Sequence, residues 1–73
     1  MLSNEGGVYS PEELSLFGAV LDRVMQSLPQ NLRTSYNRAA IARNIFACAF
    51  TGERDPDVLG RAALMDSTVS AAA

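Results

Sequence analysis

The stretch Ser10-Pro11-Glu12-Glu13, together with the later stretch Asp55-Pro56-Asp57, decides the fold. Each places a capping side chain directly before a proline. Proline is tolerated at the first position of a helix because the N–H group that it lacks would have no intrahelical partner there. In the first stretch the last glutamate follows the serine by three residues, which completes a capping box, and Tyr9 and Leu14 have the spacing of a hydrophobic staple. Both stretches therefore predict the start of a helix.

Apolar residues recur at intervals of three and four in three segments, which is the spacing of one helix face. The pattern predicts helices over residues 10–28, 35–51 and 55–66. Pro29 ends the first helix because proline cannot continue the hydrogen-bond ladder. Gly52 follows the second helix at the position where the backbone usually turns to positive φ.

The predicted fold class is all-α, with a helical hairpin and a shorter third helix. The 73 residues, 1–73, make a single domain. A chain of this size buries only about 60% of its unfolded surface, so its stability is marginal. We expect residues 1–9 to be a flexible lead and residues 67–73 a flexible tail, because neither segment shows helical periodicity.

The helix at 35–51 is predicted to be the central and most buried one, because its apolar residues cover more than half of the helix circumference. These residues are Ile41, Ala42, Ile45, Phe46, Cys48, Ala49 and Phe50. This arrangement places Phe46 in the core. Asn37, Asn44 and Thr51 would then mark the exposed face.

The residue types argue against catalysis and metal binding. The chain has no histidine, and Cys48 is its only cysteine, which removes the commonest general base, ordinary zinc sites and a disulfide within the chain. No glycine-rich phosphate loop is present. We expect a non-enzymatic protein without catalytic, metal or cofactor sites, in which Cys48 is a small core residue.

The sequence also bears on location. No apolar stretch approaches the roughly 20 residues of a membrane span, and no signal peptide is visible. A lone cysteine fits a reducing compartment. We therefore expect a cytoplasmic protein with no membrane partner.

Charge is unevenly distributed along the chain, whose net charge is −2. Residues 1–22 carry acids only, residues 23–52 carry arginines only, and residues 53–73 are again acidic on balance. Two interpretations are open. The arginines neutralise acidic helix starts within the domain, or they form a surface for an acidic partner or a phosphate backbone. The candidate contact residues are Arg33, Arg38, Arg43 and Arg54.

One part of the chain has a residue pattern similar to that of known sequences. The residues concerned are Arg38-Ala39-Ala40-Ile41-Ala42-Arg43-Asn44-Ile45, Ala49, Gly52-Glu53-Arg54-Asp55-Pro56, Leu59 and Ala63-Leu64. This pattern resembles that of small bacterial helical proteins with no assigned activity, and the resemblance implies a cytoplasmic helical protein. In physical terms, Arg54 is placed to bridge to a nearby carboxylate or to the carbonyls that end the second helix.

These observations favour a protein-interaction module or regulatory adaptor that binds another protein or a second copy of itself. The apolar faces are wide for so small a domain. Two apolar strips lie beside the main helix faces, one at Leu16 and Val20 and the other at Ile41 and Cys48. Either the third helix covers them, or one of them is left open as a dimer seam or a partner-binding groove. The alternative is a nucleic-acid-associated regulator that uses the central arginines, with asparagines of the second helix reading adenine.

Overall fold

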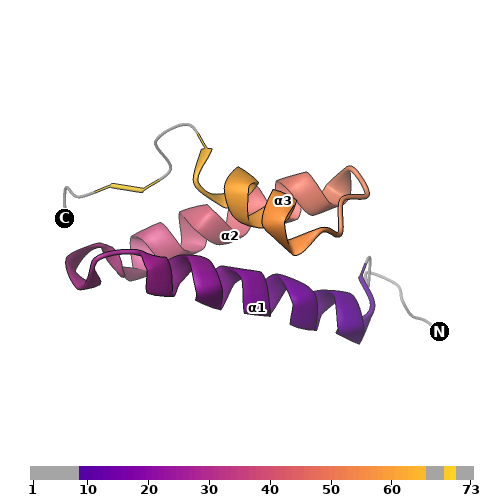
Figure 1. The fold of residues 1–73 in the computed structure, drawn as a ribbon, viewed down its shortest axis with the longest axis horizontal. Coiled ribbons are helices and arrows are strands. Elements are labelled where there is room, and N and C mark those ends of the chain that lie inside the picture. Colours follow the sequence, from indigo (N-terminus) through magenta and orange to yellow (C-terminus); the bar gives the residue numbers. More distant parts are fainter. Residues whose placement is uncertain (1–8, 66–68, 71–73) are drawn as a thin grey trace.

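The computed structural model describes residues 9–65 and 69–70, and these residues form an all-α fold of three helices in mutual contact (Figure 1). Helix α1 spans Pro11–Ser27, α2 spans Ser35–Phe50 and α3 spans Pro56–Ala63, with a short 3-10 turn, η1, at Gln30–Leu32. α1 and α2 form an antiparallel hairpin joined through η1, and α3 folds back along both of them. No strand occurs in the part of the chain that the structure describes.

Each helix stops one to three residues before its predicted end. The reason is that the last residues serve as caps rather than as helical positions. Leu28, for example, has an extended backbone, which is the conformation that a following proline imposes. Of the predicted lead and tail, positions 1–8, 67–68 and 71–73 lie outside the described residues. Tyr9 and Val69 are described and pack against the core, and Ser70 is hydrogen-bonded to Asn37.

The predicted helix-start and helix-stop signals are confirmed. The Ser10 hydroxyl oxygen accepts a hydrogen bond from the Glu13 N–H at 3.1 Å, and the Glu13 carboxylate accepts one from the Ser10 N–H at 2.8 Å. The Asp55 carboxylate caps α3 by accepting from the Asp57 N–H at 2.8 Å. Gly52 follows α2 with φ of +103°, a backbone conformation that side-chain-bearing residues rarely adopt.

The core is an apolar seam to which all three helices contribute. Its members are Phe17, Val20, Val24, Met25, Ile41, Ile45, Ala49, Leu59 and Ala63. Ile41 of α2 and Leu59 of α3 are completely buried, and Ile45 is 1% exposed. Because the hydrophobic effect scales with the apolar area removed from water, this seam is the main source of stability in so short a chain.

The two asparagines of α2 do not mark an exposed face, and that prediction is wrong. Asn37 is fully buried, and its amide nitrogen donates to the carbonyls of Leu32 (2.8 Å) and Ser70 (2.9 Å) while its oxygen accepts from the Ser70 N–H (2.8 Å). Asn44 is half-buried and donates to the carbonyl of Ala63 at the end of α3 (3.2 Å). Both amides satisfy backbone groups that secondary structure leaves unpaired, so their polarity is compatible with burial.

The prediction that Phe46 lies in the core is also wrong. Phe46 is 39% exposed and Phe50 is 79% exposed, whereas Val20 and Ile41 are buried. The apolar arc of α2 is wider than two neighbouring helices can cover. Since α3 packs on the side of α2 that carries Ile41, the opposite edge of the arc stays in solvent. Of the strips singled out by periodicity, Val20 and Ile41 are covered, whereas Cys48 is half-buried and lines an open groove.

Leu59→Ala tests the importance of the seam. We expect the substitution to lower the free energy of unfolding by about 2–5 kcal/mol, because it leaves a cavity where all three helices meet. The loss would approach the whole stability of a domain this small. The measurement is urea denaturation followed by circular dichroism. Leu14→Ala is the matched control, and we expect it to cost less than about 1 kcal/mol because Leu14 is 49% exposed. Equal costs for the two variants would contradict this account.

Candidate functional site

Arg33, a predicted contact residue, bonds to the end of α1. Its Nε donates to the carbonyl of Leu28 at 3.0 Å, and its Nη2 donates to the carbonyl of Gln26 at 2.9 Å. The last carbonyls of a helix have no intrahelical donors, and the helix dipole favours a cation there. Arg33 therefore caps the α1 C-terminus.

Two further arginines pair with carboxylates of neighbouring helices. Arg38 of α2 lies 3.4 Å from Asp22 of α1, and Arg23 of α1 lies 3.8 Å from Asp57 of α3. All four side chains are more than half exposed, so these pairs contribute little to stability. They fit the internal-neutralisation interpretation only in part, because the start of α3 pairs with α1 rather than with α2, and the acid beside Arg38 lies in the second half of α1 rather than at its start.

Arg54 lies at the junction of all three helices. Its guanidinium contacts Glu13 of the α1 capping box at 2.9 Å (Nη2) and 3.0 Å (Nε), and Nη1 donates to the carbonyl of Ala49 near the end of α2 at 2.8 Å. The same group lies over the rings of Tyr9 and Phe17, 5.5 and 5.4 Å from their centroids. The predicted bridging role of Arg54 is thus confirmed. Its donors are occupied by groups of its own chain.

Tyr9 joins this junction in a way that the staple prediction did not foresee. Its ring packs edge-on to Phe17, with centroids 5.0 Å apart, and against Phe46 at 5.8 Å. Such aromatic pairs favour edge-to-face geometry because ring faces are negative and ring edges positive. Leu14, the predicted staple partner, is 49% exposed.

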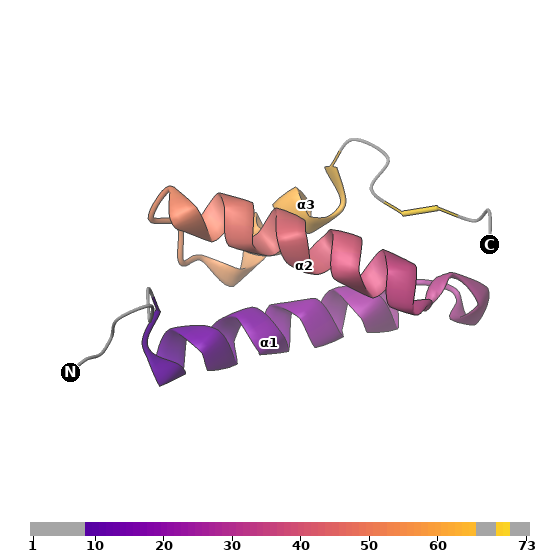
Figure 2. The same ribbon diagram turned by 180° about the vertical axis from the view of Figure 1, so that it is seen from behind.

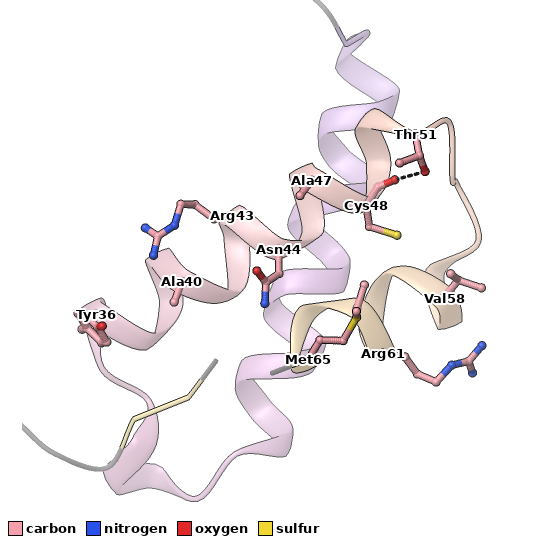
Figure 3. Close-up of a pocket in the computed structure, with 11 residues that line it drawn as sticks. Tyr36, Ala40, Arg43, Asn44, Ala47, Cys48, Thr51, Val58, Arg61 and Met65 are labelled. Atoms are coloured by element: carbon pink, nitrogen blue, oxygen red, sulfur yellow. Dashed lines mark hydrogen bonds between the residues drawn. The ribbon is translucent and has the colours of Figure 1, made fainter. Parts of the chain in front are cut away.

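Arg43 differs from the other three candidate residues. Neither Arg43 nor Arg61 of α3 lies within ion-pair distance of a carboxylate among residues 9–65 and 69–70. Both line an open groove of about 720 Å³ between α2 and α3, and Figure 3 shows their side chains on opposite sides of it, directed away from each other. The groove is lined by Tyr36, Ala40, Arg43, Asn44, Ala47, Cys48, Thr51, Val58, Arg61, Ala62 and Met65.

Cys48 is half-buried and packs against the core while lining this groove. Figure 3 shows its sulfur on the side that faces α3, and the Thr51 hydroxyl donates to the Cys48 carbonyl at 2.7 Å. The thiol is therefore part of the groove wall as well as a packing residue.

A second surface adjoins the groove, and we call it the outer face of α2. It consists of Tyr36, Ala39, Arg43, Phe46, Ala47 and Phe50, all of which are exposed. Their spacing of three and four residues places them on one side of the helix. In Figure 2, α2 lies in front of α3. Phe46 lies at the α1 edge of this face, where its ring packs against Phe17 with centroids 5.3 Å apart. Arg43 is the only charged residue on it.

Within the described residues, no group of three or more metal-ligating side chains comes together. None of the helices described has the length and apolar character needed to cross a membrane. Comparison of the chain with protein-family models, with curated proteins and with solved structures finds no match. The resemblance to small bacterial helical proteins stays a prediction.

Sequence reasoning missed two residues of this region, Arg61 and Tyr36. Arg61 was not distinguished from the paired arginines, although Val58, Arg61, Ala62 and Met65 are spaced to lie on one helix face. Tyr36 starts the regular spacing of the outer face, which was a usable signal.

The Arg54 junction predicts a pH dependence of stability. The pKa of Glu13 is lowered from its ordinary value of 4.5, first by the hydrogen bond from the Ser10 N–H and then by Arg54. Because the folded pKa lies below the unfolded one, ionised Glu13 stabilises the fold above pH 4.5, and this contribution is lost as the pH falls through the lowered value. Glutamine keeps a capping-box side chain but removes the charge.

We therefore expect Glu13→Gln to be less stable than wild type near neutral pH, and the difference to shrink as the pH falls below 4.5. The measurement is the free energy of unfolding from urea titrations at a series of pH values. Glu12→Gln is the control, since it removes a charge from the same helix turn without touching Arg54. The same pH dependence in both variants would assign the effect to the helix dipole instead of the bridge.

Proposed function

We propose that this protein is a non-enzymatic interaction module that binds another protein or a second copy of itself through the outer face of α2. The observation that carries the proposal is the exposure of two aromatic rings on one face of the helix. Tyr36 is 68% exposed and Phe50 is 79% exposed, and Phe46 between them is 39% exposed. Large apolar side chains that are exposed along one face of a helix are candidates for burial by a partner.

The residue types of the outer face support the same conclusion. Tyrosine, phenylalanine and arginine are enriched at the centres of protein interfaces, whereas aspartate, glutamate and lysine are depleted. The outer face has aromatic residues, alanines and one arginine, with no acid. The two small residues, Ala39 and Ala47, would let a partner backbone approach closely.

The contacts of the arginines favour a protein partner over nucleic acid. Arg33, Arg38 and Arg54 bond to carbonyls or carboxylates of their own chain. Asn37 is buried and has no free edge with which to read a base. We include a cytoplasmic location in the proposal, because a lone thiol suits a reducing compartment.

Phe50→Ser tests the proposal with little risk to the fold, because so exposed a side chain contributes within about 0.5 kcal/mol to stability. We expect the wild-type chain to dimerise in sedimentation equilibrium, or to retain a protein from a nuclease-treated lysate of its source organism, and Phe50→Ser to lose that association. Leu64→Ser is the matched control, since Leu64 is 41% exposed and lies off this face.

The proposal would be contradicted if the wild-type chain were monomeric and retained no protein from the lysate. Equal retention by wild type and Phe50→Ser would also contradict it. Retention that disappears with nuclease treatment would favour the nucleic-acid alternative.

A further inference from the structure

The groove between α2 and α3 is positively charged, although the chain has a net charge of −2. Arg43 and Arg61 both line it, and none of the described residues that line it is acidic. The remaining arginines of the chain are bonded to carbonyls or carboxylates among the described residues. No carboxylate in the described part of the chain neutralises these two arginines, so their charge can meet that of a partner.

The groove is long, and four of its eleven lining side chains are small. Its α2 wall runs from Tyr36 to Thr51, which corresponds to about 22 Å of helix. Small lining residues come from both helices, namely Ala40, Ala47, Cys48 and Ala62. A long, open groove in which small residues of both helices lie between the larger ones can accept another helix, which is the helix-in-groove mode of recognition.

The positions of the two arginines argue against a single small anion as the occupant. Arg43 projects from α2 and Arg61 from α3, and the two side chains point away from each other (Figure 3). They do not converge on one point. They are instead placed to meet negative charges on both flanks of an elongated partner that lies between them.

We infer that this groove binds an amphipathic helix of a partner protein, with the apolar ridge of that helix against the small residues and carboxylates on both of its flanks. This inference goes beyond the proposed function, because it assigns a protein partner of stated chemistry to the groove rather than to the outer face of α2. A second copy of the chain fits less well, because the uncovered helix face that it would offer belongs to α2. That helix, Ser35–Phe50, carries arginines and no acid, so like charges would meet.

The probe is a synthetic, end-blocked peptide of about 18 residues, slightly longer than the groove. It has leucines at i, i+3, i+4 and i+7 positions and glutamates on both flanks of that ridge. A twin peptide has lysine at every glutamate position. Affinities for the full chain are measured by fluorescence anisotropy, and the site is mapped by amide chemical shifts. We expect the glutamate peptide to bind about tenfold more tightly and to shift residues of α2 and α3 that line the groove.

Substitution of the two arginines separates charge recognition from simple apolar adhesion. We expect Arg43→Gln/Arg61→Gln to lose the preference for the glutamate peptide. Gln26→Glu/Gln30→Glu changes the net charge by the same amount at exposed positions outside the groove, and it should keep the preference. In Arg43→Glu/Arg61→Glu the preference should reverse toward the lysine peptide. An unfolded variant would lose binding to both peptides, so a reversed preference cannot result from unfolding.

The outcomes distinguish this inference from the proposed function. Equal binding of both peptides, chemical shifts outside the groove, or tighter binding of a DNA duplex than of the glutamate peptide would overturn the inference. If Phe50→Ser nevertheless abolishes association with a protein, the proposed function stands with a different partner chemistry. If Phe50→Ser has no effect while the peptides discriminate as expected, the groove is the binding site and the outer face is not.

Discussion

The seam closed by α3 is the constraint on which the rest of the structure depends. α3 has eight residues and contains Gly60, so it is too short and too weak to be helical by itself. It is held by the burial of Leu59 and Ala63 against the hairpin. Once α3 lies there, the side of α2 that is covered and the side that stays open are both determined.

Polar contacts at the ends of the helices position this seam without supplying most of its energy. Arg54 joins the start of α1 through Glu13, the end of α2 through Ala49, and the aromatic ring of Tyr9. At the other end of the hairpin, Asn37 holds the backbone at Leu32 and Ser70 together. Each contact satisfies backbone or charged groups that would be costly to leave unpaired in a partly buried position.

The candidate surface is a consequence of this packing. α2 has a wider apolar arc than α1 and α3 can cover, so Tyr36 and Phe50 remain exposed on its outer face. The same geometry leaves a groove on the α3 side of α2, and the arginine on each wall has no ion pair with a carboxylate among residues 9–65 and 69–70. Aromatic surface and positive charge thus lie side by side on one helix. Aromatic residues and arginine are the residue types enriched at protein interfaces, and the proposed function depends on this combination.

The sequence by itself determined the features that depend on residues a few positions apart. Helix starts at Ser10 and Asp55 and the positive φ of Gly52 are local, because a cap or a turn involves only neighbouring residues. Arg33, Arg38, Arg43 and Arg54 were equivalent candidates for a contact surface in the sequence. Only the tertiary structure separated Arg43 from the rest, buried Asn37 and exposed Phe50. Those outcomes depend on which face of α2 the third helix covers, and the spacing of apolar residues alone does not predict that face.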